Sequence, residues 1–247
     1  MKKIGLVVLF FAVLIQTSRA IVAVPHPAVC TNQPAWESTL SFGAALTSGD
    51  SESVLTTSDF KTHRLNPTNE LTMEIQGSYG ENDSVKNNET LHGDAQYNHL
   101  FTDRTYCYGR ADGLHDGIAD VAYRATISPG AGYYFVKSKE TTFAGELGPG
   151  GVFERVDGSV ENYAAPRLAE RFEHKVDGHL HFWENMEFLP QVDESRNFLV
   201  NTEVGVETPL TKRISLRTVL DDNFANVPAP GHTDNNMQLI SGLSYKF

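Results

Sequence analysis

The chain has 247 residues, of which 20 are basic and 31 acidic, so its formal net charge at neutral pH is −11. An acidic chain without a basic stripe repels phosphate backbones, and nucleic acid is therefore not expected as a partner. No nucleophile elbow, zinc-binding motif or phosphate-binding loop is present, so the sequence predicts no enzyme of those classes and no cofactor. Beyond the N-terminal segment no apolar run approaches about 18 residues, so a membrane protein would have to be a closed β-barrel.

The N-terminus has the features of a cleaved secretory signal peptide over residues 1–20. Two lysines precede an apolar run from Ile4 to Ile15, and Ser18-Arg19-Ala20 supplies a small-x-small cleavage site. Cleavage leaves 17 basic and 31 acidic residues, a net charge of −14. Residues 21–35 are then expected to form an N-terminal periplasmic lead, and residues 36–247 the folded domain.

Two cysteines enter an oxidising compartment after export. Cys30 lies in the N-terminal lead and Cys107 in the domain. One disulfide between them and two free thiols are both compatible with the sequence, because neither cysteine belongs to a motif.

From Trp36 onward, segments of about ten residues with alternating polarity are separated by clusters of Gly, Asn, Asp, Ser, Thr or Pro. Helical periodicity is almost absent, so the fold class is all-β, an antiparallel transmembrane β-barrel of about 12 strands. An even strand number is typical of bacterial outer-membrane barrels. The predicted strands are 38–47, 53–63, 70–80, 88–99, 104–113, 120–134, 141–153, 161–174, 178–189, 197–208, 212–222 and 236–247.

The predicted connections alternate between short and long. Short ones lie at 66–69, 102–104, 137–139, 176–178 and 209–211, whereas the others are longer and acidic. Short turns at one rim and long loops at the other are the outer-membrane layout, with both chain ends on the periplasmic side. Divalent cations are candidate partners of the acidic loops, with Asp112, Asp116 and Asp120 as the candidate oxygen ligands and solvated acidic loops as the alternative.

The last strand carries a candidate assembly signal. Phe247 ends the chain, and Leu243 and Tyr245 precede it on the same face. This pattern resembles the C-terminal signal that the barrel assembly machinery reads, and its strand edge offers a β-augmentation site. The predicted partners are therefore that machinery and the lipids of the outer membrane.

Charged residues on the polar faces of the strands are expected in the lumen. They form either a structural network or a charged constriction that selects ions. By the same alternation Glu170 and Glu184 point toward lipid, unless a β-bulge shifts the register. The predicted lumen charge network consists of Arg124, Arg167, Arg171, Glu173, Glu187, Glu203 and Glu207, and the predicted outward aromatics are Tyr79, Tyr97, Tyr133, Phe143, Phe172, Phe182 and Phe188.

Four segments also carry a family resemblance: residues 46–50 (LTSGD), residues 163–175 (YAAPRLAERFEHK), residues 187–190 (EFLP) and residues 201–216. Through them the chain, over residues 36–247, resembles the YdiY-like family of salt-induced outer-membrane proteins, a domain of unknown function. The resemblance implies an outer-membrane barrel with no established activity and a possible link to salt or osmotic response. The two cysteines depart from the family pattern.

The sequence therefore favours a porin-like component of the cell envelope, either structural or a narrow pore for ions or small solutes, with a lumen largely filled by side chains. Two alternatives stay open. An outer-membrane lipid hydrolase could use scattered histidines such as His92, His174 or His181, and a secreted soluble β-barrel could hold a small ligand.

Overall fold

The computed structural model describes residues 36–47, 53–176, 179–194 and 196–247, and every regular element among them is a β-strand. The expected signal peptide, the N-terminal lead and Cys30 lie outside these residues. None of the described residues forms a helix that is long and apolar enough to cross a membrane.

Fourteen strands are present, and their bounds follow in chain order. They are β1 Glu37–Thr47, β2 Ser53–Leu65, β3 Asn69–Asn82, β4 Val85–Leu100, β5 Thr105–Asp116, β6 Val121–Lys137, β7 Thr141–Gly148, β8 Gly151–Val156, β9 Ser159–Ala164, β10 Arg167–Val176, β11 Leu180–Pro190, β12 Phe198–Pro209, β13 Ile214–Ala225 and β14 Asn235–Lys246.

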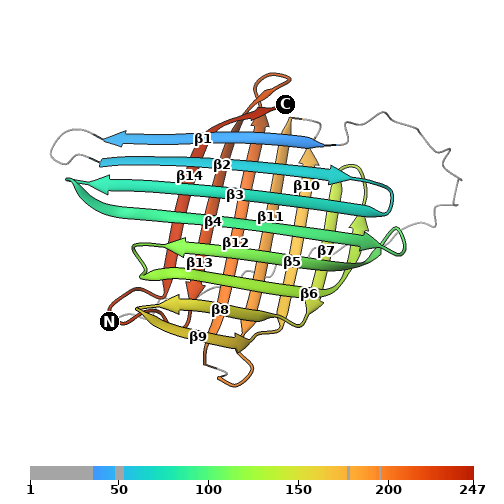
Figure 1. Cartoon of the computed structure of the whole chain (residues 1–247). Coiled ribbons are helices and arrows are strands. Elements are labelled where there is room, and N and C mark those ends of the chain that lie inside the picture. Colours follow the sequence, from blue (N-terminus) through green and yellow to red (C-terminus); the bar gives the residue numbers. More distant parts are fainter. Residues whose placement is uncertain (1–35, 48–52, 177–178, 195) are drawn as a thin grey trace, which may run out of the picture. The chain divides into compact units, whose positions relative to one another are not determined.

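The strands close into a twelve-stranded antiparallel barrel. Strands β1 to β6 pair in sequence, β6 pairs with β7 and β8, β7 pairs with β10, and β10 to β14 again pair in sequence. The first and last strands complete the circle, with Thr39 opposite Lys246 and Gly43 opposite Gly242. In Figure 1 strands β1 to β6 form the front wall, and β10 to β14 are visible behind them. The predicted fold class is confirmed.

Fourteen elements make twelve barrel positions because two predicted strands are each interrupted by a proline. Pro149 separates β7 from β8, and Pro166 separates β9 from β10. The register is the same on both sides of the break, since Gly148 lies opposite Arg167 and Gly151 opposite Ala164. Proline has no N–H group to donate to the ladder, so pairing stops at these positions without altering the hairpin.

The long connections differ from the prediction at two places. Strands β3 and β4 are joined by Asp83 and Ser84, and strands β8 and β9 by Asp157 and Gly158, all four with positive φ. Two consecutive residues of positive φ match the twist of a hairpin, so the turn is tight. The acidic segments next to Asp83 and Asp157 are extensions of the strands, whereas residues 191–197 and 226–234 are longer connections; the predicted loop at 48–52 lies outside the described residues.

Side chains alternate between the outer face and the lumen. Exposed large apolar residues such as Phe42, Ile75 and Leu239 point outward. Two apolar clusters are buried on the inner side. One contains Leu100, Tyr106, Tyr108, Tyr134 and Ala144, and the other contains Val152, Ala165, Leu189 and Leu199.

Candidate functional site: a charged network in the lumen

Glu146 of β7 is the centre of the densest polar cluster in the lumen, and its side chain has no exposed surface. Arg167 Nη1 lies 2.7 Å from Glu146 Oε2, and Arg171 Nη2 lies 3.2 Å from Oε1. The Tyr106 hydroxyl and the Gln96 amide each donate a hydrogen bond of 2.7 Å to Oε1. Both carboxylate oxygens are therefore satisfied by groups from β4, β5 and β10, which a buried charge requires.

Arg110 of β5 connects this cluster to β11. Its Nη1 donates to Asp94 at 3.1 Å, and its Nε lies 3.6 Å from a carboxylate oxygen of Glu187 on β11. Glu187 also pairs with Arg167. Strands β5 and β11 are not neighbours in the barrel, so this contact crosses part of the lumen.

A second cluster surrounds Arg217 of β13. Its guanidinium pairs with Asp59 of β2 and lies 3.4 Å from Glu74 of β3, and Lys61 binds the other oxygen of Glu74 at 2.7 Å. Strands β14 and β1 separate β13 from β2, so the ion pairs of Arg217 join strands that are not neighbours in the barrel.

Aromatic side chains fill the space beside the charges. Tyr106 lies over Gly132 of the neighbouring strand, where an added Cβ would lie 2.2 Å from a carbon of the ring. Tyr134 donates a hydrogen bond of 2.6 Å to Glu70, and Trp183 donates to Glu203. Tyrosine and tryptophan suit this role, because a large ring fills volume while its polar atom is satisfied.

Together these contacts form the lumen network, a charged layer across the barrel. Among the described residues it contains nine carboxylates and six Lys or Arg side chains, and His92 also pairs with Asp112, so carboxylates outnumber basic side chains. The Lys and Arg side chains are Lys61, Arg110, Lys137, Arg167, Arg171 and Arg217, and the carboxylates are those of Asp59, Glu70, Glu74, Asp94, Asp112, Glu146, Glu187, Glu203 and Asp221.

The predicted network residues occupy three levels of the barrel. Arg167, Arg171, Glu187 and Glu203 belong to the lumen network. Arg124 lies elsewhere, paired at 2.5 Å with Glu154 of β8 beyond the proline break. At the opposite end, Glu173 lies 3.6 Å from His181. Glu207 borders the lumen network, because it lies opposite Arg217 in the register of β12 and β13.

The sequence interpretation missed the residues at the centre of the network, Glu146, Arg110 and Arg217. A signal for them was present. Each lies on the polar face of a predicted strand, and period-two alternation extended through every strand would have placed all three in the lumen. Alternation along a strand does not predict which strands face each other across the barrel.

The outer face carries two arcs of aromatic rings. Tyr133, Phe135, Phe143, Phe172 and Phe182 follow one another across β6, β7, β10 and β11, with ring centroids 5.3 to 6.4 Å apart. Phe188, Phe198 and Phe224 form the second arc with spacings of 5.7 Å. Such arcs are typical of the aromatic girdles at the two edges of a membrane.

Glu170 and Glu184 do point outward. The pairing of β10 with β11 continues without a register shift, with Glu170 opposite Met186 and Glu184 opposite Phe172. No bulge turns either carboxylate away. On β11, Glu184 lies between Phe182 and Phe188, which belong to different aromatic arcs.

The assembly-signal residues lie on the outer face at the barrel seam, with Leu243, Tyr245 and Phe247 exposed by 54%, 41% and 61%. The Phe247 amide donates to the Ser38 carbonyl at 3.1 Å across the seam. Cys107, half-buried on β5, has no disulfide partner among the described residues. Its predicted disulfide partner, Cys30, lies outside the described residues, so the pairing stays a prediction.

The three aspartates of the candidate cation site do not converge. Asp112 pairs with His92, Asp116 accepts hydrogen bonds from the amides of Ile118 and Ala119, and Asp120 pairs with His232. Across the described part of the chain no three His, Cys, Asp or Glu side chains are grouped so that they could hold a metal ion.

A family model described as "Protein of unknown function, DUF481" matches residues 40–247. No curated protein matches the chain. Among solved structures, the NanC porin has a TM-score of 0.53 at 8% identity, covering 85% of this chain and all of that one. The translocator domain of the autotransporter NalP from Neisseria meningitidis has a TM-score of 0.48 at 10% identity, and the match covers 87% of this chain and 90% of that one. The KdgM porin in complex with disordered oligogalacturonate has a TM-score of 0.47 at 11% identity, and the match covers 85% of this chain and 99% of that one. At 8% identity the likeness to the NanC porin is one of fold.

Proposed function

The chain belongs to the DUF481 family of proteins of unknown function, and from that premise we propose that it is an outer-membrane barrel of the bacterial envelope that conducts ions but excludes larger solutes. The proposal has two parts, the location of the barrel and the conduction through its lumen.

The outer face supports the location. Large apolar side chains such as Phe42, Ile75 and Leu239 are exposed by 59%, 58% and 67%, which is costly in water and favourable in lipid. Two aromatic arcs lie on the outer face as well, one across β6 to β11 and one across β11 to β13. An N-terminal signal peptide and the C-terminal residues Leu243, Tyr245 and Phe247 would deliver the chain to the barrel assembly machinery, and outer-membrane lipids would surround the inserted barrel.

The lumen network carries the proposal about conduction. Arg110 and Glu187 approach each other across the barrel, and Arg217 bridges to Asp59 and Glu74, so long side chains divide the interior. A twelve-stranded barrel lies between small filled barrels and wide porins in size, and its side chains decide how open it is. A sugar would have to break several ion pairs to pass, whereas a small ion would not.

The excess of carboxylates supports a preference for cations. Rings of acidic groups select cations in channels, and the effect weakens as salt screens the exposed charges. We further propose that this conduction takes part in a salt or osmotic response, as the resemblance to the YdiY-like proteins suggests. Acidic loops at the rim would add to the local concentration of cations.

Planar bilayers containing the purified protein test this function. We expect single-channel currents of ionic scale in KCl and a reversal potential on the cation-selective side under a salt gradient. The Arg167→Ala, Arg171→Ala double variant should conduct more, whereas Arg124→Ala, at the far end of the lumen, should conduct as the parent does. Absence of any current, or free passage of large sugars, would refute the proposal.

A further inference from the structure

The lumen network does not fill the barrel evenly. Both apolar clusters lie on β4 to β12 and the segments between them, and so does Glu146 with its partners. The wall made by β13, β14, β1 and β2 carries Arg217, Val219, Ile240 and Asp59 on its inner face, with serine and glycine at the seam itself. Ser41 and Ser244 meet there with their hydroxyl oxygens 3.0 Å apart, and one step further along the seam Gly43 lies opposite Gly242.

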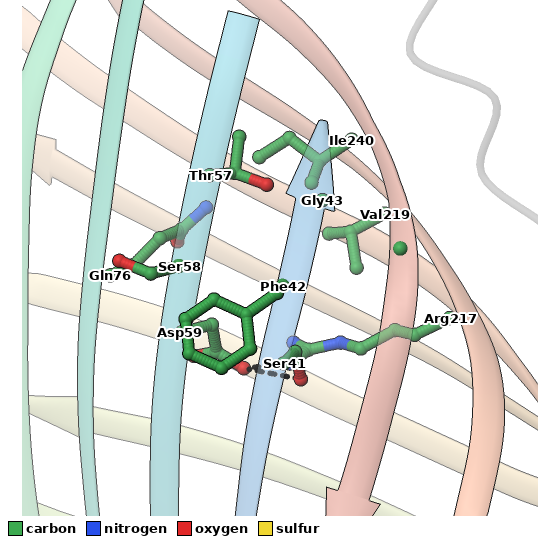
Figure 2. Close-up of a pocket in the computed structure, with 11 residues that line it drawn as sticks. Ser41, Phe42, Gly43, Thr57, Ser58, Asp59, Gln76, Arg217, Val219 and Ile240 are labelled. Atoms are coloured by element: carbon green, nitrogen blue, oxygen red, sulfur yellow. Dashed lines mark hydrogen bonds and ion pairs between the residues drawn. The ribbon is translucent and has the colours of Figure 1, made fainter. Parts of the chain in front are cut away.

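A small cavity of about 30 Å³ lies against this wall. Figure 2 shows Val219 and Ile240 at one end of it and Ser41, Asp59 and Arg217 at the other. Gly43 and Gly242 lie where β1 and β14 approach closely, since an added Cβ would lie 2.5 Å from the Thr57 hydroxyl oxygen at Gly43 and 2.2 Å from the Phe42 carbonyl oxygen at Gly242. The cavity thus lies next to the Arg217 cluster but is not occupied by it.

Two polar atoms at this cavity have no hydrogen-bond partner among the described residues. They are Oδ2 of Asp59, an acceptor, and Nε of Arg217, a donor, and both are buried from bulk solvent. Leaving a buried polar atom unsatisfied costs about 1–3 kcal/mol, so water or a hydrated solute is expected to occupy the space. The unpaired Asp59 oxygen can accept from water or bind a cation, and the unpaired Arg217 N–H requires an acceptor.

We infer that small hydrated cations cross the lumen along the seam route, the path beside β14 and β1 bounded by Ser41, Gly43, Val219, Ile240 and Gly242. Asp59 is the carboxylate that a passing ion meets, and Arg217 limits the width of the path by its ion pairs with Asp59 and Glu74. This inference rests on the proposed function and names the part of the lumen that performs it.

Thiol accessibility tests the route without measuring current. In a Cys30→Ser, Cys107→Ser background, Ile240→Cys places a thiol at the cavity, and Ala144→Cys places one in the buried cluster on the opposite wall. A small cationic methanethiosulfonate reagent should modify Ile240→Cys at least about tenfold faster, because only that thiol faces the hydrated cavity. Equal rates at the two sites would overturn the inference, even if the parent protein conducts.

Conductance gives the second test, with a volume-matched control. Ile240→Ala and Leu199→Ala each remove three carbons from the inner face, the first at the cavity and the second in the apolar cluster. We expect Ile240→Ala to raise the single-channel conductance about twofold and Leu199→Ala to leave it unchanged. Asp59→Asn should reduce the cation preference.

The possible failures are distinguishable. A parent protein without current refutes the pore and the route together. A parent that conducts, with equal effects of Ile240→Ala and Leu199→Ala, refutes only the route. The thiol reagent should also change the conductance of the Ile240→Cys variant. If the conductance is the same before and after modification, ions pass elsewhere.

Discussion

Replacing Glu146 by glutamine should strongly destabilise the barrel. The change keeps the shape of the side chain but removes the charge that lies between Arg167 and Arg171, at 2.7 and 3.2 Å. The Glu146 side chain is fully buried, so water cannot take over its role. Arg167 would retain Glu187, whereas Arg171 would keep only the Tyr106 hydroxyl at 3.3 Å.

The size of the destabilisation depends on the arginine that the Glu146→Gln substitution leaves without its ion pair. Breaking a buried ion pair by removing one partner costs about 3–5 kcal/mol, because the other charge stays buried without compensation. Removing Arg171 as well should restore part of that loss. We therefore expect Glu146→Gln to lower the free energy of unfolding by about 3 kcal/mol or more, and the double variant with Arg171→Gln to lose less than Glu146→Gln alone.

Urea denaturation in detergent micelles, followed by the shift between folded and unfolded bands in electrophoresis, measures this difference. Glu89→Gln is the control, because Glu89 pairs with Lys86 at 2.8 Å while both side chains are exposed. A loss at Glu146 no larger than at Glu89, or a double variant that loses the sum of both single changes, would refute the central role given to Glu146.

Three further predictions concern assembly, the lumen and the outer face. Deleting Phe247 should lower the amount of inserted protein while export continues, because its amide donates a hydrogen bond across the seam and its ring is part of the proposed assembly signal. A membrane-fractionation blot that shows unchanged insertion would contradict this role of Phe247. Replacing Arg167 and Arg171 together by alanine should raise conductance or lower the unfolding temperature, and a variant that changes neither would contradict the filled lumen. Replacing Glu170 and Glu184 by leucine should stabilise the barrel in lipid by about 1 kcal/mol each, whereas the same change at the lumen-facing Glu173 should not.

The strand pattern was predictable because period-two alternation is local. The twelve barrel positions and the outward side of Phe172, Phe182 and Phe188 follow from it directly. Pro149 and Pro166 were visible in the sequence as well, yet only the unchanged register across them shows that they interrupt strands without ending the hairpin.

The lumen network was predictable only in part, because it depends on which strands meet across the barrel. The facing of Arg167 and Glu187 follows from adjacent strands and was anticipated. The contact of Arg110 with Glu187 depends on barrel closure and on the stagger between strands, which no local pattern encodes. The tight turn at Asp157 and Gly158 was missed because acidic residues near a turn were interpreted as a loop.

Solute exclusion tests the account most directly. Proteoliposomes containing the purified barrel should release a KCl gradient rapidly but should not swell in isotonic monosaccharide or larger sugars, because the lumen network admits ions alone. Swelling in sugars at a rate comparable to that of an open porin would contradict the account, since it would require a lumen that the paired side chains of Arg110, Glu146 and Glu187 do not divide.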